Sequence, residues 1–134
     1  MFQLQILSPL GEVFNDSVEE VSLPTENGEI SLLTHHTPLF SKLSEGTLTI
    51  KKAGKQTVIA IVGGFLEVGD ELVTVLSDYA IKAENIQIAK AEEAKKRAEE
   101  FIANKQSTAD LIMAEKELQK SLLELKVAGK AKHH

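Results

Sequence analysis

The sequence predicts an α+β fold, with an antiparallel β-sandwich (a flattened barrel) over residues 1–83 and an αα-hairpin over residues 84–134. In the front part apolar and polar residues alternate, which is the period of a half-buried strand. In the back part apolar residues recur every three or four positions, as on one face of a helix. The period changes between Lys82 and Asn85, so we place the domain boundary there.

Five segments of the front part have the pattern of strands. They are Phe2–Ile6, Val13–Leu23 (ended by Pro24), Thr47–Ile50, Val58–Val62 and Leu72–Leu76. The fourth is continuously apolar, as expected for a strand buried on both faces. Four dipeptides typical of turns separate them: Asn27-Gly28, Ala53-Gly54, Gly63-Gly64 and Gly69-Asp70. Short strands at this spacing are typical of an antiparallel sandwich.

Two helical arms of roughly 20 residues, each ~30 Å long, are expected in the back part. The first spans Ile86–Ile102, and its apolar stripe is Ala91, Ala94, Ala98 and Phe101. The pattern is interrupted between Asn104 and Thr108. The second stripe is Leu111, Ala114, Leu118, Leu122 and Leu125, and Gly129 is expected to end the helix.

The first helical stripe consists mainly of alanines, which bury little area. Each buried CH₂ contributes about 0.8 kcal/mol, so three alanines contribute about half of what three leucines would. Small side chains allow close packing but hold an element weakly. The hairpin is therefore predicted to be a movable domain, with ordinary tight helix packing as the alternative reading of the alanine stripe.

Composition excludes several classes of function. The longest apolar run, Val58–Leu66, is far shorter than the ~20 residues of a membrane helix, and the start of the chain has no basic signal-peptide region. The absence of cysteine fits a reducing compartment. Residues 1–83 hold 11 acidic residues against five lysines, which argues against nucleic-acid binding.

No motif for catalysis or metal binding is present. The sequence has neither a Gly-rich phosphate loop ending in Lys-Ser/Thr nor a Gly-x-Ser-x-Gly elbow. His35 and His36 are adjacent, so in an extended chain they point opposite ways, and no third ligand stands at a suitable spacing. We therefore expect no enzyme active site and no metal site.

The most informative segment runs from Gly28 to Leu39. Gly28 permits a positive φ at the turn that opens the segment. Pro38 fixes its own φ and restricts Thr37 to extended geometry. The resulting corner is predicted to be stiff and to present His36 to another molecule.

This segment resembles part of the epsilon-subunit family of bacterial and chloroplast F-type ATP synthases. The matching residues are Glu29, Ile30, Leu32, His36, Pro38 and Leu39. The blocks Gly63–Val68 and Val73–Asp78 and the charged, Ala-rich helix Ala89–Phe101 follow in the family's order. The resemblance covers almost the whole chain and implies the same two-sheet sandwich and helical hairpin.

The resemblance implies a non-catalytic rotor subunit of a proton- or sodium-translocating synthase. The sandwich would lie at the foot of the central stalk, against the gamma subunit and the c-ring. Glu29, His36, Thr37 and Pro38 would form part of this rotor interface. The subunit would be peripheral, on the cytoplasmic face of the bacterial membrane or the stromal face of the thylakoid.

The resemblance further implies that the hairpin folds onto the sandwich or extends along gamma into the alpha/beta head. The extended form would inhibit ATP hydrolysis. Lys116, Lys120 and Lys126 are the residues expected to meet an acidic segment of the beta subunit.

ATP-binding members of the family carry Ile-Asp-x-x-Arg-Ala at the start of the first helix. Here the acid is replaced by Gln87 and the arginine by Lys90. Lysine lacks the planar two-pronged geometry of arginine. The sequence therefore predicts weak ATP binding or none, and no other cofactor.

The sequence leaves two alternative functions open. The chain could be a free-standing β-sandwich adaptor whose coiled-coil tail binds an unrelated protein. Within the synthase, the hairpin could serve assembly only.

Overall fold

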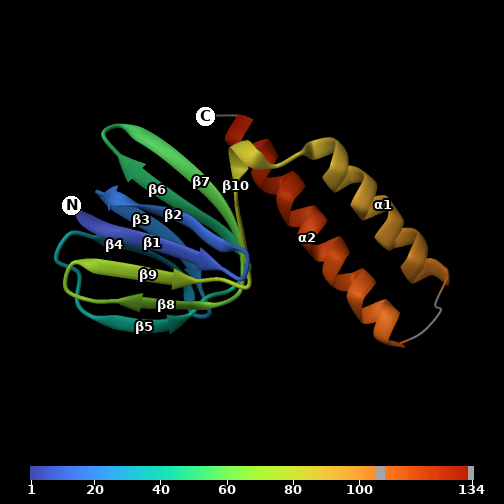
Figure 1. The fold of residues 1–134 in the computed structure, drawn as a ribbon, viewed down its shortest axis with the longest axis horizontal. Helices are drawn as coiled ribbons and strands as arrows, with labels where there is room; N and C mark the ends of the chain where they lie inside the picture. The colour runs from blue at the N-terminus through green and yellow to red at the C-terminus, as the bar shows by residue number, and fades with distance from the viewer. Residues whose placement is uncertain (105–107, 133–134) are drawn as a thin grey trace. The chain divides into compact units, whose positions relative to one another are not determined.

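A computed structural model describes the backbone of residues 1–104 and 108–132, and the side chains of residues 1–103 and 111–129. The chain divides into two compact units, Met1–Lys82 and Ala83–His134. Over the described residues, the first unit holds ten strands, and the second holds a short 3₁₀ helix and two α-helices (Figure 1).

The strands of the first unit form two five-stranded sheets. They are β1 Phe2–Ser8, β2 Gly11–Val18, β3 Glu20–Thr25, β4 Gly28–Leu33, β5 Leu39–Lys42, β6 Gly46–Lys52, β7 Lys55–Val62, β8 Phe65–Val68, β9 Leu72–Leu76 and β10 Tyr79–Lys82. One sheet has the order β2-β1-β9-β8-β5 and the other β10-β7-β6-β3-β4. All neighbours are antiparallel except β1 and β9, which are parallel. The predicted sandwich is confirmed.

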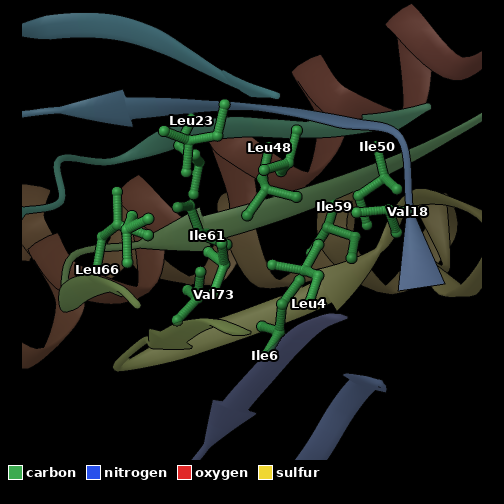
Figure 2. Packing of buried hydrophobic residues seen from close by; sticks show 14 of the residues in the cluster. Leu4, Ile6, Val18, Leu23, Leu48, Ile50, Ile59, Ile61, Leu66 and Val73 are labelled. Atoms are coloured by element: carbon green, nitrogen blue, oxygen red, sulfur yellow. The ribbon is translucent and has the colours of Figure 1, made fainter. Parts of the chain in front are cut away.

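The core between the sheets is almost wholly aliphatic (Figure 2). Phe2, Leu4 and Ile6 are buried on β1, as their alternation predicts. On β7 the central residues Ile59, Ala60 and Ile61 are buried, while the residues at both ends of the predicted segment are half-buried. Each fully buried aliphatic side chain contributes about 1.5–3 kcal/mol, so this cluster is the main stabilising element of the sandwich.

The predicted single stretch Val13–Leu23 is wrong. It is divided at Glu19 between β2 and β3, which belong to different sheets. Pro24 does not end β3 but lies inside it. It is tolerated there because β3 pairs with β6 only from Glu20 to Ser22, so the missing N–H lies beyond that ladder.

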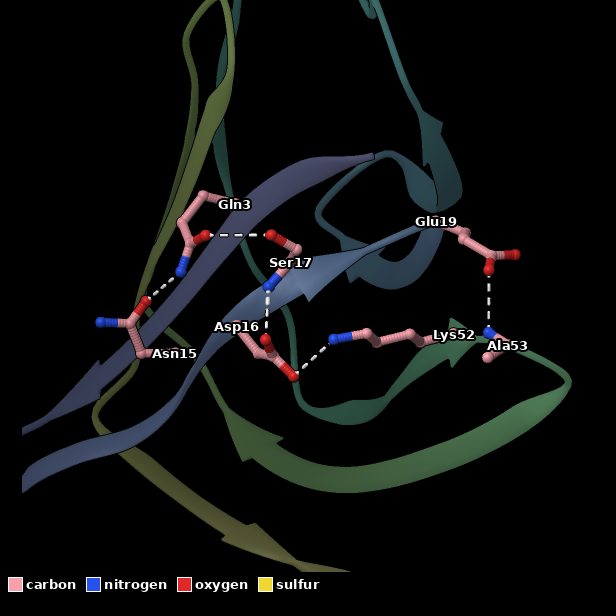
Figure 3. Close-up of polar contacts among 7 residues, drawn as sticks. All are labelled: Gln3, Asn15, Asp16, Ser17, Glu19, Lys52 and Ala53. Atoms are coloured by element: carbon pink, nitrogen blue, oxygen red, sulfur yellow. Dashed lines mark hydrogen bonds and ion pairs between the residues drawn. The ribbon is translucent and has the colours of Figure 1, made fainter.

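Polar contacts join β2 of one sheet to the β6–β7 hairpin of the other (Figure 3). Lys52 Nζ donates to the Asp16 carboxylate at 2.9 Å, and the Ala53 backbone N–H donates to Glu19 Oε1 at 2.8 Å. The hydrogen bond from Lys52, helped by one from the Ser17 N–H, holds the pKa of Asp16 below its ordinary value of 3.8. These contacts link the two sheets beside the bend between β2 and β3.

The second unit contains η1 Ala83–Asn85, α1 Ile88–Asn104 and α2 Thr108–Lys132. The two α-helices pack against each other, and α2 also contacts η1. Of the predicted stripe of the first helix, Ala91, Ala94 and Ala98 are buried and Phe101 is half-buried. Neither helix, over its described residues, combines the length and the apolar character needed to cross a bilayer.

The prediction for the second helix is wrong in its last third. Leu122 is 46% exposed, whereas Leu123 and Val127 are buried. At about 100° per residue, the buried residues Ser121, Leu123, Val127 and Ala128 form one broad face of α2, and Leu122 lies roughly opposite its centre. Gly129 does not end the helix; it lies within α2 and does not adopt a positive φ.

Candidate partner-binding surfaces

The predicted corner connects the edge strands of the two sheets. It follows β4, at the edge of one sheet, and leads into β5, at the edge of the other. His35 has a φ of 66°, and His36 Nδ1 lies 2.7 Å from the Thr37 carbonyl oxygen. Thr37 and Pro38 are exposed and His36 is half-buried. The corner is thus a folded turn rather than an extended segment.

Glu29 lies at the other end of β4. It is exposed and pairs in register with Pro24, and the adjacent Gly28 has a φ of 113°. From Glu29 to Leu33 the strand is about 13 Å long, and the corner begins only after Leu33. The structure therefore brings His36, Thr37 and Pro38 together at the corner, with Glu29 on the same edge strand but outside it.

The loops beside Glu29 are held by hydrogen bonds. The Asn27 backbone N–H donates to Thr25 Oγ1 at 3.2 Å, and the Ser44 N–H donates to the Pro24 carbonyl at 3.0 Å. This network joins the β3–β4 turn to the β5–β6 loop. Glu29 is therefore presented by a fixed end of the sandwich.

Gly63, Gly64 and Ser77 lie together where the β7–β8 turn meets the end of β9. A Cβ atom on Gly64, which has a φ of 108°, would lie 1.9 Å from the Leu76 carbonyl oxygen. The buried Ser77 hydroxyl lies 2.7 Å from the Tyr79 carbonyl oxygen and 3.1 Å from that of Gly63. These residues shape the fold and are not exposed for binding.

A group of exposed apolar side chains lies on the sheet that contains β5, β8 and β9. Phe40 is 68% exposed, Phe65 46% and Leu76 51%. The rings of Phe40 and Phe65 stack with centroids 5.7 Å apart. No sequence pattern predicted this group. Phe40 and Phe65 lie outside the five predicted strands, and their presence in an aromatic-poor chain was the only signal.

Two hollows lie between α1 and α2. One, of about 210 Å³, is lined by charged residues with a small apolar floor: Lys90, Ala91, Ala94, Arg97, Glu117, Lys120, Ser121 and Glu124. The other, of about 320 Å³, is mostly apolar: Ala94, Arg97, Ala98, Phe101, Met113, Ala114 and Glu117. Both are open along the seam of the hairpin.

The ATP-motif positions lie at the start of α1. Gln87 is exposed immediately before the helix, and its carbonyl accepts a hydrogen bond from the Ala91 N–H at 3.0 Å. Lys90 lines the charged hollow together with Lys120 of α2. Glu117 and Glu124 also line the hollow, so carboxylates lie beside its cationic side chains.

The three predicted beta-contact lysines do not share one face. Lys116 and Lys126 are exposed, whereas Lys120 is half-buried in the charged hollow. At about 100° per residue, Lys126 is rotated by roughly 80° from Lys116 around the helix. Among the described residues, no group of three histidine or acidic side chains is placed to hold a metal ion.

Both units match models of known protein families. A model of the ATP synthase delta/epsilon chain β-sandwich domain matches residues 1–83, and a model of the delta/epsilon chain long α-helix domain matches residues 84–129. The chain therefore belongs to the ATP synthase delta/epsilon family. The predicted family resemblance is confirmed.

The individual relatives that match this chain are ATP synthase epsilon chains. The ATP synthase epsilon chain of Caldanaerobacter subterraneus subsp. tengcongensis is 42% identical, covering 96% of this chain and 94% of the relative. The epsilon chain of Dehalococcoides mccartyi is 40% identical over 98% and 95%. That of Bacillus pumilus is 38% identical over 96% and 97%.

Solved structures share the fold at lower identity. A chain in the Euglena gracilis mitochondrial ATP synthase structure of OSCP, F1 and c-ring has a TM-score of 0.65 at 21% identity, covering 98% of this chain and 80% of that one. A chain in the Tetrahymena thermophila central stalk and c-ring structure has a TM-score of 0.61 at 15% identity, covering 94% and 95%.

Proposed function

We propose that the chain is a non-catalytic rotor subunit of an F-type ATP synthase. Its sandwich binds the gamma subunit and the c-ring, and its hairpin restrains ATP hydrolysis in the alpha/beta head. The observation that carries the proposal is the end-to-end match of sandwich and helices, in order, to epsilon chains. The chain would act as a peripheral subunit on the cytoplasmic face of the membrane.

The rotor contact is assigned to Glu29, His36, Thr37 and Pro38. Three features support the assignment: the exposure of Glu29, Thr37 and Pro38, the hydrogen-bonded loops beside Glu29, and the turned backbone at the corner. Exposed charge at the rim of an interface acts mainly on specificity and association rate. Glu29 would face cationic or amide groups of the partner.

The restraint on hydrolysis is assigned to the hairpin. The alanine seam supports it, because small side chains hold α1 and α2 to each other only weakly. Lys116 and Lys126 are exposed on α2 and available to acidic groups of the beta subunit. Exposed ion pairs contribute about 0.2–1 kcal/mol each, so several contacts must act together. Added salt would then weaken the inhibition.

ATP binding by this chain is proposed to be weak or absent. The charged hollow offers Lys90, Arg97 and Lys120, but Glu117 and Glu124 line it as well. A polyphosphate placed there would meet two carboxylates. The replacement of an acid and an arginine by Gln87 and Lys90 removes the charge and the planar fork of the family motif.

Two experiments test the proposal. Affinity capture with this chain as bait should recover alpha, beta and gamma subunits; their absence would favour a free-standing adaptor with an unrelated partner. The double variant Glu29→Lys, His36→Ala should then weaken binding to the rotor without altering the thermal unfolding of the sandwich. Unchanged affinity would contradict the assignment of these residues.

A further inference from the structure

The charged hollow of the hairpin is lined by opposite charges at the same spacing on its two helices. Lys90 and Arg97 are seven residues apart on α1, and Glu117 and Glu124 are seven residues apart on α2. Seven residues are close to two helical turns, so the two charges of each helix lie on one face, about 10 Å apart. Figure 1 shows that the two helices run antiparallel. The cations of α1 and the carboxylates of α2 therefore repeat in step along the seam.

The apolar hollow next to it shows how these charges are aligned. Arg97 and Glu117 line both hollows, whereas Lys90 and Glu124 line only the charged one. Arg97 therefore lies level with Glu117, at the boundary between the hollows. Because the helices are antiparallel, seven residues back along α1 and seven residues forward along α2 bring Lys90 level with Glu124. Each of these cations of α1 thus faces a carboxylate of α2.

Small buried residues allow the charged side chains to meet across the seam. Ala91 and Ala94 of α1 and Ser121 of α2 line the same hollow and are buried. Their short side chains let the two backbones approach closely. The apolar stems of lysine and arginine can lie along such a surface while their charged ends stay in water. Of the four charged residues only Glu124 is half-buried, so their attraction is modest and is screened by salt.

We propose that the pairs Lys90–Glu124 and Arg97–Glu117 form a charge clasp, which fixes the register of α1 against α2 and holds the hairpin closed without a nucleotide. Charged pairs between helices set orientation and partner choice in the same way in coiled coils. The two carboxylates that a polyphosphate would meet in the hollow are then the groups that hold the helices together. Lys120 adds a third cation to the same hollow. Closure of the hairpin should therefore respond to ionic strength and not to ATP.

Hydrogen exchange of the full chain tests the clasp, because exchange in peptides from α1 and α2 reports local opening. Glu117→Lys places a like charge beside Arg97. It should speed exchange in both helices by about three- to tenfold, since an exposed attraction becomes a repulsion of similar size. The swapped variant, Arg97→Glu with Glu117→Arg, restores an opposite pair. Its exchange should return to within about twofold of the unmodified chain.

Glu115→Lys is the matched control. Glu115 is exposed on α2, lies outside the lining of both hollows and is rotated by about 200° from Glu117 around the helix. Its substitution changes the net charge equally, but exchange should change less than about twofold. Equal effects of Glu115→Lys and Glu117→Lys would show that only net charge matters and would overturn the clasp. Exchange that stays fast in the swapped variant would also overturn it.

The second pair provides an independent test, and it decides the question if Glu117→Lys lowers the helix content of the chain. Glu124→Lys should speed exchange, and Lys90→Glu combined with Glu124→Lys should restore it. Failure of this swap to restore slow exchange would overturn the pairing of Lys90 with Glu124.

Salt and nucleotide distinguish the clasp from a hairpin that a ligand holds closed. Raising the salt from about 0.1 M to about 1 M shortens the Debye length from about 10 Å to about 3 Å. Exchange should then speed up in the unmodified chain and slow down in Glu117→Lys, where the screened interaction is a repulsion. Added ATP should leave exchange unchanged; slower exchange with ATP would overturn the clasp. These measurements use the free chain, so they remain decisive even if the chain is not a rotor subunit.

Discussion

At the scale of single residues, the backbone at Gly64 depends on the absence of a side chain. Its φ of 108° is in the region that favours glycine, and any Cβ would overlap the Leu76 carbonyl. Gly28 has nearly the same φ, 113°, but open space around its Cβ position. Substitutions at these two glycines therefore distinguish the cost of backbone strain from the cost of steric overlap.

Gly64→Ala should destabilise the chain by more than about 3 kcal/mol, because strain and overlap add. The matched control Gly28→Ala carries only the strain and should cost about 1–2 kcal/mol. Urea unfolding of both variants measures the difference. Equal losses of unfolding free energy would show that the β7–β8 turn can relax around a methyl group.

Asp16 gives a pH-dependent prediction. Its pKa is lowered in the folded chain, so its contribution to stability is present above the unfolded value of 3.8 and is lost as pH falls through the lower folded pKa. Asp16→Asn should lower the melting temperature at pH 6, and this difference should shrink below pH about 3.8.

The control for this prediction is the partner that contributes most to the shift. In a Lys52→Met background, Asp16→Asn should have a much smaller effect, because the hydrogen bond from Lys52 is already absent. A melting difference that persists unchanged from pH 6 to pH 2.5 would contradict the assigned cause.

At the scale of elements, sequence patterns predict those whose burial is regular. β1 and α1 each bury one face, so their periods give their core residues correctly. The patterns fail where burial changes along an element. Val13–Leu23 passes from one sheet to the other, and the buried face of the last third of α2 lies roughly opposite Leu122 of the predicted stripe.

The candidate surfaces of the sandwich also differ in how far the sequence predicts them. A stiff corner around His36 was predictable because Pro38 acts locally, but the positive φ of His35 was not. The exposed apolar group on β5, β8 and β9 was not predictable, because it exists only when these strands are assembled in register. Four-residue strands such as β5 and β8 also carry too few residues to show a period.

The charged hollow of the hairpin gives a prediction for ATP. Calorimetric titration of the full chain should show weak binding or none. Gln87→Asp with Lys90→Arg should strengthen it, since each charge-assisted contact contributes about 1.5–3 kcal/mol. Glu124→Gln, which removes a carboxylate lining the hollow, should strengthen it independently. Tight binding by the unmodified chain would show that other residues form an ATP site.

At the scale of the whole molecule, the two units have different kinds of core. The first is closed by ten strands and aliphatic side chains, whereas the second depends on an alanine seam. A chain ending at Lys82 should therefore unfold cooperatively and still bind gamma. A gradual, non-cooperative transition in the fragment would show that the sandwich needs the helices to fold.

The central claim is that the sandwich attaches this chain to the rotor while the hairpin restrains hydrolysis. The most direct measurement is the ATP hydrolysis rate of the assembled complex, with the full chain and with a chain lacking residues 84–134. Gel analysis of each complex confirms that the chain is bound. We expect faster hydrolysis after the deletion, with the truncated chain still present. Equal rates in two complexes that both retain the chain would contradict it and leave the hairpin with a role in assembly only.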